Sequence, residues 1–210
     1  MNNHKDKFAI CIGRQLASGG RAVGRMLAER LGAEYYDREI LDIAARESGM
    51  CREVFEQNDE RKGIFGAAFR SMSSLIGMNS AYSAQNRNIE LFALQANAIQ
   101  KAADEGNCIF IGRAADYILR EHTNCLSVFI SADEEDRIDT LCKDRNMEPG
   151  EARHLIEKVD SKRADFYNFF SGKKWGAARS YDICINTSRT GIEGAAAIIE
   201  MALNDLLKDK

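Results

Sequence analysis

The chain has one proline, one tryptophan and three histidines, and it has no long hydrophobic run. No apolar stretch approaches the roughly 18 residues that a membrane-spanning helix needs. The opening MNNHKDKFAICIG lacks the apolar segment and small-residue cleavage site of a secretory signal. His4, His122 and His154 are scattered and give no metal-ligand spacing. We therefore expect a protein of the cytoplasm with no membrane partner and no protein-bound metal cluster.

Positive charge is not in excess either. The 29 Lys and Arg residues face 32 Asp and Glu residues, for a net charge of −3, whereas general nucleic-acid binders usually carry a cationic surplus. None of the six cysteines forms a C-x-x-C pair, and four of them, Cys11, Cys108, Cys125 and Cys184, lie in apolar runs. We interpret these four as buried free thiols. A nucleic-acid partner is not expected, although a local basic pocket for phosphates is compatible with this composition.

Short apolar runs alternate with longer helical patterns along the 210 residues. Continuously apolar runs cover residues 8–12, 108–111, 126–130 and 181–185, and a weaker one covers residues 34–37. Such runs are typical of parallel strands that are buried on both faces. Helical patterns cover residues 20–31, 88–105, 133–141 with Ser131 or Asp133 as cap, a segment starting at Glu148-Pro149, and 191–207. The alternation predicts one α/β domain over residues 1–210.

The segment of residues 51–82 differs from the rest because it is rich in Gly, Ser, Met and Asn and has no clear period. We interpret residues 51–87 as a helical insert on the substrate side of the domain, with residues 61–87 as the part whose order the sequence does not determine. Segments of this kind form lids and substrate-facing flaps, and they also occur as plain surface excursions.

The turn GRQLASGGR, residues 13–21, connects the first strand to the first helix. Free backbone N–H groups converge at such a point and the helix dipole favours an anion there. The standard phosphate-binding pattern is G-x-x-x-x-G-K-[ST]. This chain has Gly19, but Gly20 stands in the place of the lysine, Arg21 follows it, and Ala22 comes next, so no Ser or Thr offers a hydroxyl for Mg²⁺ there. By pattern alone, both a phosphate loop and a simple glycine turn fit.

Four segments in this order resemble the cytidylate kinase-like family, a branch of the P-loop nucleoside-monophosphate kinases. They are CIGRQLASGGRAVGRMLAERLGAEYYD, NCIFIGRAADYIL, VFISADEEDRIDTL and YDICINTS. The resemblance implies a three-layer α/β P-loop kinase fold with a parallel five-stranded sheet, a helical lid and a helical insert. It also implies ATP-dependent phosphoryl transfer to a small acceptor, with CMP as the first candidate and with ATP and Mg²⁺ as cofactors.

The resemblance also implies a set of site residues. The ATP phosphates would lie over Gly13, Arg14, Gln15, Ala17, Ser18, Gly19, Gly20, Arg21 and Ala22. Arg21 is expected to replace the lysine, because a guanidinium group binds phosphate in a bidentate manner. The acceptor is expected near Asp37 and Arg38, and near Arg113 and Asp116 at the end of a predicted parallel strand.

Residues 133–175 correspond to the lid of nucleotide kinases, whose arginines stabilise charge on the transferring phosphoryl group. Asp160 and Arg163 match the end of the family's R-D-x-x-R lid motif, so Arg163 and then Arg137 are the expected catalytic residues of the lid. The interspersed acidic residues also fit a solvated helix face. The aromatic residues at 166–170 and Trp175 predict a packing surface, for the lid itself or for a homodimer.

Two alternative functions stay open at this point. One is a kinase that acts on another small metabolite, since a fold hosts many functions. The other is a non-catalytic module that binds a nucleotide or an anion, which the missing lysine and the missing hydroxyl support.

Overall fold

The computed structural model describes residues 7–37 and 82–208. The chain divides into two compact units, one formed by residues 1–38 and 99–210 and the other by residues 39–98. In the second unit the described residues form the first part of helix α5 (Tyr82–Glu105), and the rest of the predicted insert, residues 51–81, lies outside the described residues. The single domain over residues 1–210 stays a prediction.

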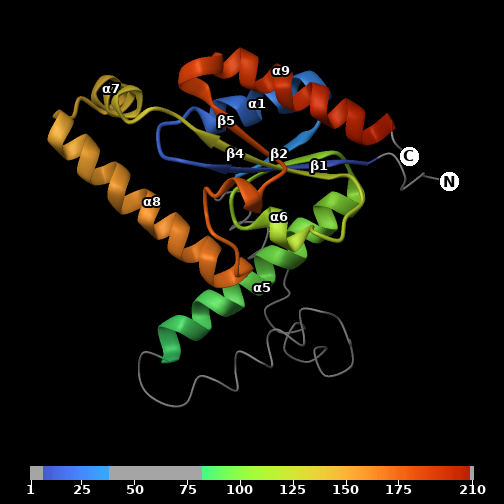
Figure 1. Cartoon of the computed structure of the whole chain (residues 1–210). Helices are drawn as coiled ribbons and strands as arrows, with labels where there is room; N and C mark the ends of the chain where they lie inside the picture. Colours follow the sequence, from blue (N-terminus) through green and yellow to red (C-terminus); the bar gives the residue numbers. More distant parts are fainter. Residues whose placement is uncertain (1–6, 38–81, 209–210) are drawn as a thin grey trace. The chain divides into compact units, whose positions relative to one another are not determined.

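The first unit contains a sheet of five parallel strands, as predicted (Figure 1). Its order is β2-β3-β1-β4-β5. The strands are β1 (Ala9–Arg14), β2 (Glu34–Tyr36), β3 (Cys108–Ile111), β4 (Cys125–Ser131) and β5 (Ile183–Asn186). Each one coincides with a predicted apolar run to within a few residues, and the three central strands β3, β1 and β4 are the most buried, as expected inside a parallel sheet.

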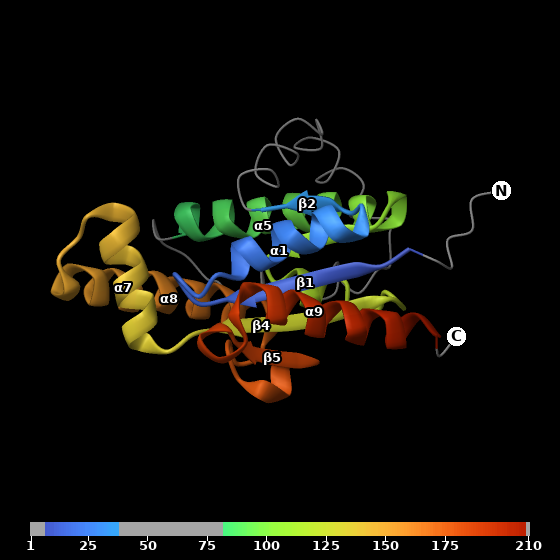
Figure 2. The ribbon, with the colours of Figure 1, turned by 90° about the horizontal axis from the view of Figure 1, so that it is seen from above.

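Helices cover both faces of this sheet. Helices α1 (Gly20–Leu31) and α9 (Thr187–Lys208) lie together on one face, and the short helix α6 (Ala115–Ile118) lies on the other (Figure 1). Helices α7 (Glu134–Arg145) and α8 (Pro149–Ser171) extend beyond the carboxyl ends of β1 and β4 (Figure 2). A short 3-10 helix, η2 (Ala178–Ser180), precedes β5. None of the helices in the described part of the chain has the length and apolarity to cross a membrane.

The main core explains how α1 is placed against the sheet. Val23 and Leu27, four residues apart on one face of α1, are fully buried against strand residues such as Ile12 and Ile111. A Cβ atom on Gly24 would lie only 2.6 Å from Ile111 Cδ1, so the absence of a side chain lets α1 approach the sheet closely. This packing fixes the N-terminal end of α1 beside the carboxyl end of β1.

The start of α8 agrees with the sequence-based prediction, whereas the capping of α7 and the start of α9 differ from it. The predicted start of α8 is confirmed, with Pro149 in its first turn and a capping box between Glu148 and Glu151. Helix α9 begins at Thr187 rather than at Gly191, which instead interrupts it with a non-helical conformation. At α7, Asp133 occupies the cap position but its side chain makes no cap hydrogen bond.

The side chains expected to cap α7 are used elsewhere. The Asp133 carboxylate accepts a hydrogen bond of 2.7 Å from Asn186 Nδ2. The Ser131 hydroxyl donates to the Ile185 backbone oxygen at 3.2 Å. Asp133 is thus the predicted cap residue by position, but no side-chain cap bond forms, because contacts with the neighbouring strand β5 compete for both groups.

The cysteine interpretation holds for some positions only. Cys11 and Cys108 are buried free thiols, as expected, and their burial raises the pKa of both. Cys125 is half-buried, and its Sγ lies 3.7 Å from that of Cys11. Cys184 is exposed, because β5 is an edge strand of the sheet, so its predicted burial was wrong.

Candidate functional site

The turn between β1 and α1 has the backbone of an anion-binding site. Ala17 and Gly19 have φ values of 59° and 73°, both in the left-handed region. The first intrahelical hydrogen bond of α1 runs from Val23 N to Gly19 O at 3.0 Å. The N–H groups of the three residues between them precede the helical ladder and point to the end where the helix dipole favours an anion.

Neighbouring segments hold this turn in shape. The Gln15 side chain accepts a hydrogen bond of 3.2 Å from Ala132 N. The buried Ser18 hydroxyl donates to Gln15 O at 2.9 Å and to Ile130 O at 3.1 Å. From α9, the Thr187 hydroxyl donates to Ser18 O at 2.9 Å. The side chains of Gln15 and Ser18 therefore shape the turn from within the protein.

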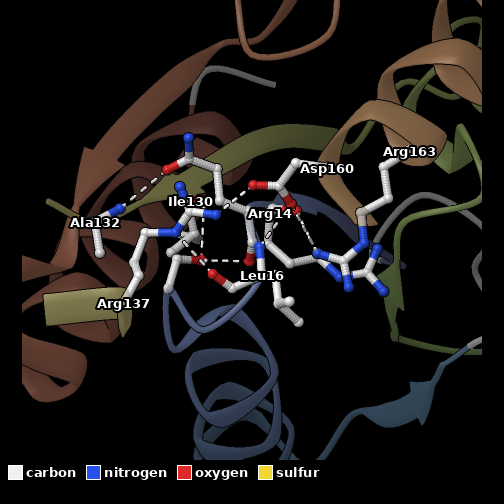
Figure 3. Close-up of polar contacts among 9 residues, drawn as sticks. Arg14, Leu16, Ile130, Ala132, Arg137, Asp160 and Arg163 are labelled. Carbon is white, nitrogen blue, oxygen red and sulfur yellow. Dashed lines mark hydrogen bonds and ion pairs between the residues drawn. The ribbon is translucent and has the colours of Figure 1, made fainter. Parts of the chain in front are cut away.

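The helices α7 and α8 are attached to the same turn by one carboxylate (Figure 3). Asp160 Oδ1 accepts a hydrogen bond of 2.8 Å from Leu16 N, and Asp160 Oδ2 pairs with the guanidinium group of Arg137. Arg137 Nε in turn donates to Leu16 O at 2.8 Å. The side chains of Arg137 and Asp160 are only 6% and 13% exposed. This buried ion pair closes around both backbone groups of Leu16.

Four arginines converge beside the turn. Burial, and then the charges of Arg163 and Arg21, lower the pKa of Arg14 to about 9, and Arg113 adds to the effect. Burial also lowers the pKa of Arg163, where the opposing effect of Asp160 is partly cancelled by Arg21 and Arg137. Arg163 Nη1 donates to the Arg14 backbone oxygen at 3.1 Å. Such a concentration of like charge attracts an anionic ligand.

The turn after β3 supplies Arg113 from the other side. Gly112, Arg113 and Ala114 have φ values of 77°, 60° and 51°. Left-handed conformations at two successive residues other than glycine are uncommon, and they concentrate at functional sites. The Arg113 guanidinium carbon lies 5.3 Å from the centroid of the Phe166 ring on α8. Arg113 thus stands at the carboxyl end of β3, as the sequence predicts.

Comparison with known proteins assigns the chain to a family. The model of the cytidylate kinase-like family matches residues 9–189. The chain belongs to the cytidylate kinase-like family. A cytidylate kinase of Pyrococcus horikoshii is 26% identical over 96% of this chain and 91% of its own length. A cytidylate kinase of Methanopyrus kandleri is 24% identical over 95% and 94% of the two chains.

Solved structures support the fold assignment. An uncharacterized protein from Eubacterium ventriosum superposes with a TM-score of 0.70 at 25% identity, covering 94% of this chain and 99% of its own. A shikimate kinase from Bacteroides thetaiotaomicron superposes with a TM-score of 0.51 at 15% identity, covering 94% and 98%. Together with the family match, they make the protein a P-loop kinase of the type that acts on nucleotides or other small metabolites.

The other residues predicted to bind the ATP phosphates differ in their surroundings. Arg21 and Ala22 are exposed on the first turn of α1. A Cβ on Gly13 would lie 2.9 Å from Phe129 and 3.1 Å from Tyr181, so Gly13 is packed under aromatic rings. Gly19 is the cap residue of α1.

The predicted acceptor residues have different surroundings. Asp116 is buried, and its Oδ2 accepts a hydrogen bond of 2.7 Å from the Tyr167 hydroxyl of α8. Burial raises the pKa of Asp116, although Tyr167 and Lys173 partly oppose this effect. Asp37 is buried just after β2. Arg38 lies outside the described residues. Acceptor binding by any of these residues stays a prediction.

Two residues that hold the site together escape the sequence reasoning. Asp160 was noticed only as part of a lid motif, whereas its carboxylate binds Leu16 N. Thr187 lies in the matched segment YDICINTS, but nothing in that segment indicates a bond to Ser18 O. Both contacts join parts of the chain that are more than a hundred residues apart, so only the folded arrangement reveals them.

Proposed function

We propose that this protein transfers the γ-phosphoryl group of ATP to a nucleoside monophosphate, with CMP as the first candidate. The observation that carries the proposal is the group of four arginines, Arg14, Arg21, Arg113 and Arg163, beside the turn that opens α1. In-line phosphoryl transfer depends on positioning and on neutralising the charge of the phosphates more than on a strong base. The cytidylate kinases among the relatives support CMP as the acceptor.

ATP is proposed as the donor because the turn offers both N–H groups and cations to its phosphates. Mg²⁺ is proposed to enter with ATP, bound to the phosphate oxygens. The loop itself does not supply the usual metal ligand, since neither Arg21 nor Ala22 has a hydroxyl and the Ser18 hydroxyl is directed to two backbone oxygens. We therefore assign no residue of the turn to the metal.

The catalytic charges are proposed to come from the turn and the lid. Arg21 and Arg163 would stabilise the charge on the transferring phosphoryl group, and Arg137 would act with them through Asp160. On the acceptor side, Arg113 and Asp37 lie at the carboxyl ends of β3 and β2, where ligands bind in open α/β sheets. Asp116 would act by keeping α8 in place beside them.

An acceptor panel with ATP consumption as the readout tests this function. The panel contains CMP, UMP and AMP, together with hydroxylated metabolites such as shikimate and gluconate, and a sample without acceptor. We expect CMP to give the fastest consumption. Turnover with one of the metabolites and none with CMP or UMP would show that the acceptor is a small metabolite rather than a nucleoside monophosphate. ATP binding without turnover on any acceptor would indicate a non-catalytic nucleotide-binding module instead of a kinase.

A further inference from the structure

Two positions of the phosphate-binding pattern have exchanged their residue types in this chain. In G-x-x-x-x-G-K-[ST] the second glycine comes five residues after the first, and the lysine follows it directly. Counting back from Gly19 places the first glycine of the pattern at Arg14, and counting forward places the lysine at Gly20. The chain therefore has an arginine where the pattern has glycine, and a glycine where the pattern has lysine.

The structure brings these two positions into contact. A Cβ atom on Gly20 would lie 2.6 Å from Arg14 Cβ and 3.0 Å from Arg14 Cγ. Real side chains do not approach so closely, so the stem of Arg14 fills the space in which a lysine at position 20 would begin. The arginine and a lysine at these two positions exclude each other.

The far end of the Arg14 side chain meets a second glycine. A Cβ on Gly112 would overlap Arg14 Nη1 and would lie 3.2 Å from Arg14 Cζ. Gly112 also has a φ of 77°, a conformation that glycine adopts without strain. Arg14 therefore extends from the end of β1, past Gly20, to the turn after β3, and a glycine at each end leaves room for it.

The surroundings of Arg14 contain cations rather than a counter-ion. Within residues 7–37 and 82–208, its guanidinium group has no hydrogen bond and no ion pair with a carboxylate. Burial is the main cause that lowers the pKa of Arg14, and the nearby charges of Arg163 and then Arg21 add to it. Figure 3 shows the side chains of Arg14 and Arg163 extending to the same region. A half-buried cation beside other cations is costly unless an anion binds there.

We propose that Arg14 takes the place of the missing P-loop lysine, and that its guanidinium group binds the phosphates of the nucleoside triphosphate. The charge reaches the phosphates from the first position of the turn instead of the last. This assignment differs from the sequence-based choice of Arg21, which is exposed on the first turn of α1. It rests on the proposed function in one respect, that the bound anion is the phosphate chain of ATP.

The exchange of residues suggests its own experiment. We would compare wild type with Arg14→Gly, with Gly20→Lys and with the double variant, which restores the standard pattern. Arg14→Gly is expected to weaken ATP binding and to lower turnover about 100-fold, the effect of removing one positioned charge donor. Gly20→Lys alone should also lose binding because of the contact with Arg14. The double variant should recover most of the ATP affinity and most of the turnover, since the lysine at position 20 then no longer meets the Arg14 side chain.

ATP affinity is measured by titration calorimetry on the full chain, turnover is measured with the best acceptor of the panel, and inorganic tripolyphosphate serves as a probe for the phosphate chain alone. Arg30→Ala is the control, because Arg30 pairs with Glu193 at the other end of α1 and should leave both quantities unchanged. Arg21→Ala is expected to lose less affinity than Arg14→Gly.

Wild-type affinity and turnover in Arg14→Gly would overturn the inference. So would a double variant that unfolds cooperatively but binds ATP no better than Arg14→Gly. If the double variant does not fold, Arg14→Lys and Arg14→Met decide: the lysine should retain more affinity for tripolyphosphate than the methionine, and equal losses would reject the role. A wild type that binds ATP without any turnover refutes the proposed function, while the binding comparison still judges Arg14. A wild type that binds neither ATP nor tripolyphosphate refutes both.

Discussion

Arg137 and Arg14 both lie at the turn between β1 and α1, and their surroundings differ in kind. Arg137 is almost fully buried, pairs with Asp160 and donates to Leu16 O. Arg14 is half-buried, pairs with no carboxylate in the described part of the chain, and lies among Arg163, Arg21 and Arg113. The same type of side chain thus has a carboxylate partner in one place and, among the described residues, none in the other.

This difference separates a structural role from a ligand-binding role. A buried cation with its carboxylate and its backbone acceptor in place holds the turn, and removing either partner leaves the other charge buried without its main counter-ion. A cation surrounded by cations works against the stability of the ligand-free protein and favours the bound state. The comparison therefore predicts opposite effects on stability for one and the same substitution at the two positions.

The largest effect is expected from Arg137→Met. It removes the buried partner of Asp160 and leaves that carboxylate only the longer, 3.5 Å ion pair with Arg163, so we expect the free energy of unfolding to fall by about 3 kcal/mol. Urea denaturation monitored by circular dichroism measures it. Arg153→Met is the matched control, because Arg153 also joins α8 to α7 through a carboxylate, Glu134, but both side chains are more than half exposed. Its loss should stay below about 1 kcal/mol, and equal losses for the two variants would contradict the structural role of Arg137.

The next effect concerns the other buried polar contact of α8. Tyr167→Phe removes the hydroxyl that donates to Asp116 Oδ2. A buried acceptor that loses its donor costs about 1–3 kcal/mol, so the variant should be destabilised by that amount in the same urea experiment. Tyr117→Phe serves as a control on α6, since the ring of Tyr117 contacts Arg120 instead. No loss in Tyr167→Phe would mean that the contact between Tyr167 and Asp116 does not stabilise the packing of α8 against α6.

A smaller, pH-dependent effect follows from Asp116 itself. Burial raises the pKa of Asp116 in the folded state above its ordinary value, so the folded protein binds more protons than the unfolded chain between these two pKa values. Asp116 then contributes stability that is present at low pH and is lost as the pH rises through the folded pKa. Asp116→Asn keeps an acceptor for Tyr167 and removes this dependence.

We expect Asp116→Asn to be more stable than wild type at neutral pH, and the difference should shrink as the pH falls. Urea denaturation at a series of pH values from neutral to acidic measures it. A difference that grows on acidification would contradict the raised pKa of Asp116 and would show that the fold stabilises its carboxylate as an anion.

The sequence predicts the sheet well because each strand carries its own signal. The runs at residues 8–12 and 108–111 are continuously apolar, and they become two adjacent buried strands. The start of α8 is equally local, since Pro149, Glu148 and Glu151 define it without help from the rest of the chain. The location of the phosphate-binding turn follows from the same kind of local order, a strand, a glycine-rich segment and a helix.

The side-chain contacts of the site were beyond such reasoning. Asp160 binds Leu16 N across 144 residues of sequence, and no local pattern encodes which backbone group a carboxylate will meet. Asp133 was expected to cap α7 because its neighbours in sequence suggest it, but Asn186 from β5 binds its carboxylate instead. The sequence alone does not indicate that an arginine at position 14 requires a glycine at position 20. The structure shows it, because a side chain at position 20 would occupy the same space as Arg14.

The smallest effect, and the one of opposite sign, is expected from Arg14→Met. Methionine keeps an apolar stem of similar reach past Gly20 and removes a desolvated charge beside Arg163. The free energy of unfolding of the ligand-free protein should therefore not fall, and it should rise by up to about 1 kcal/mol. Saturating ATP should reverse the order, because a ligand stabilises a protein in proportion to the logarithm of its affinity and the variant has lost affinity. A loss of stability in ligand-free Arg14→Met comparable to that of Arg137→Met would mean that both arginines hold the turn, and the assignment of Arg14 to the phosphates would lose its physical basis.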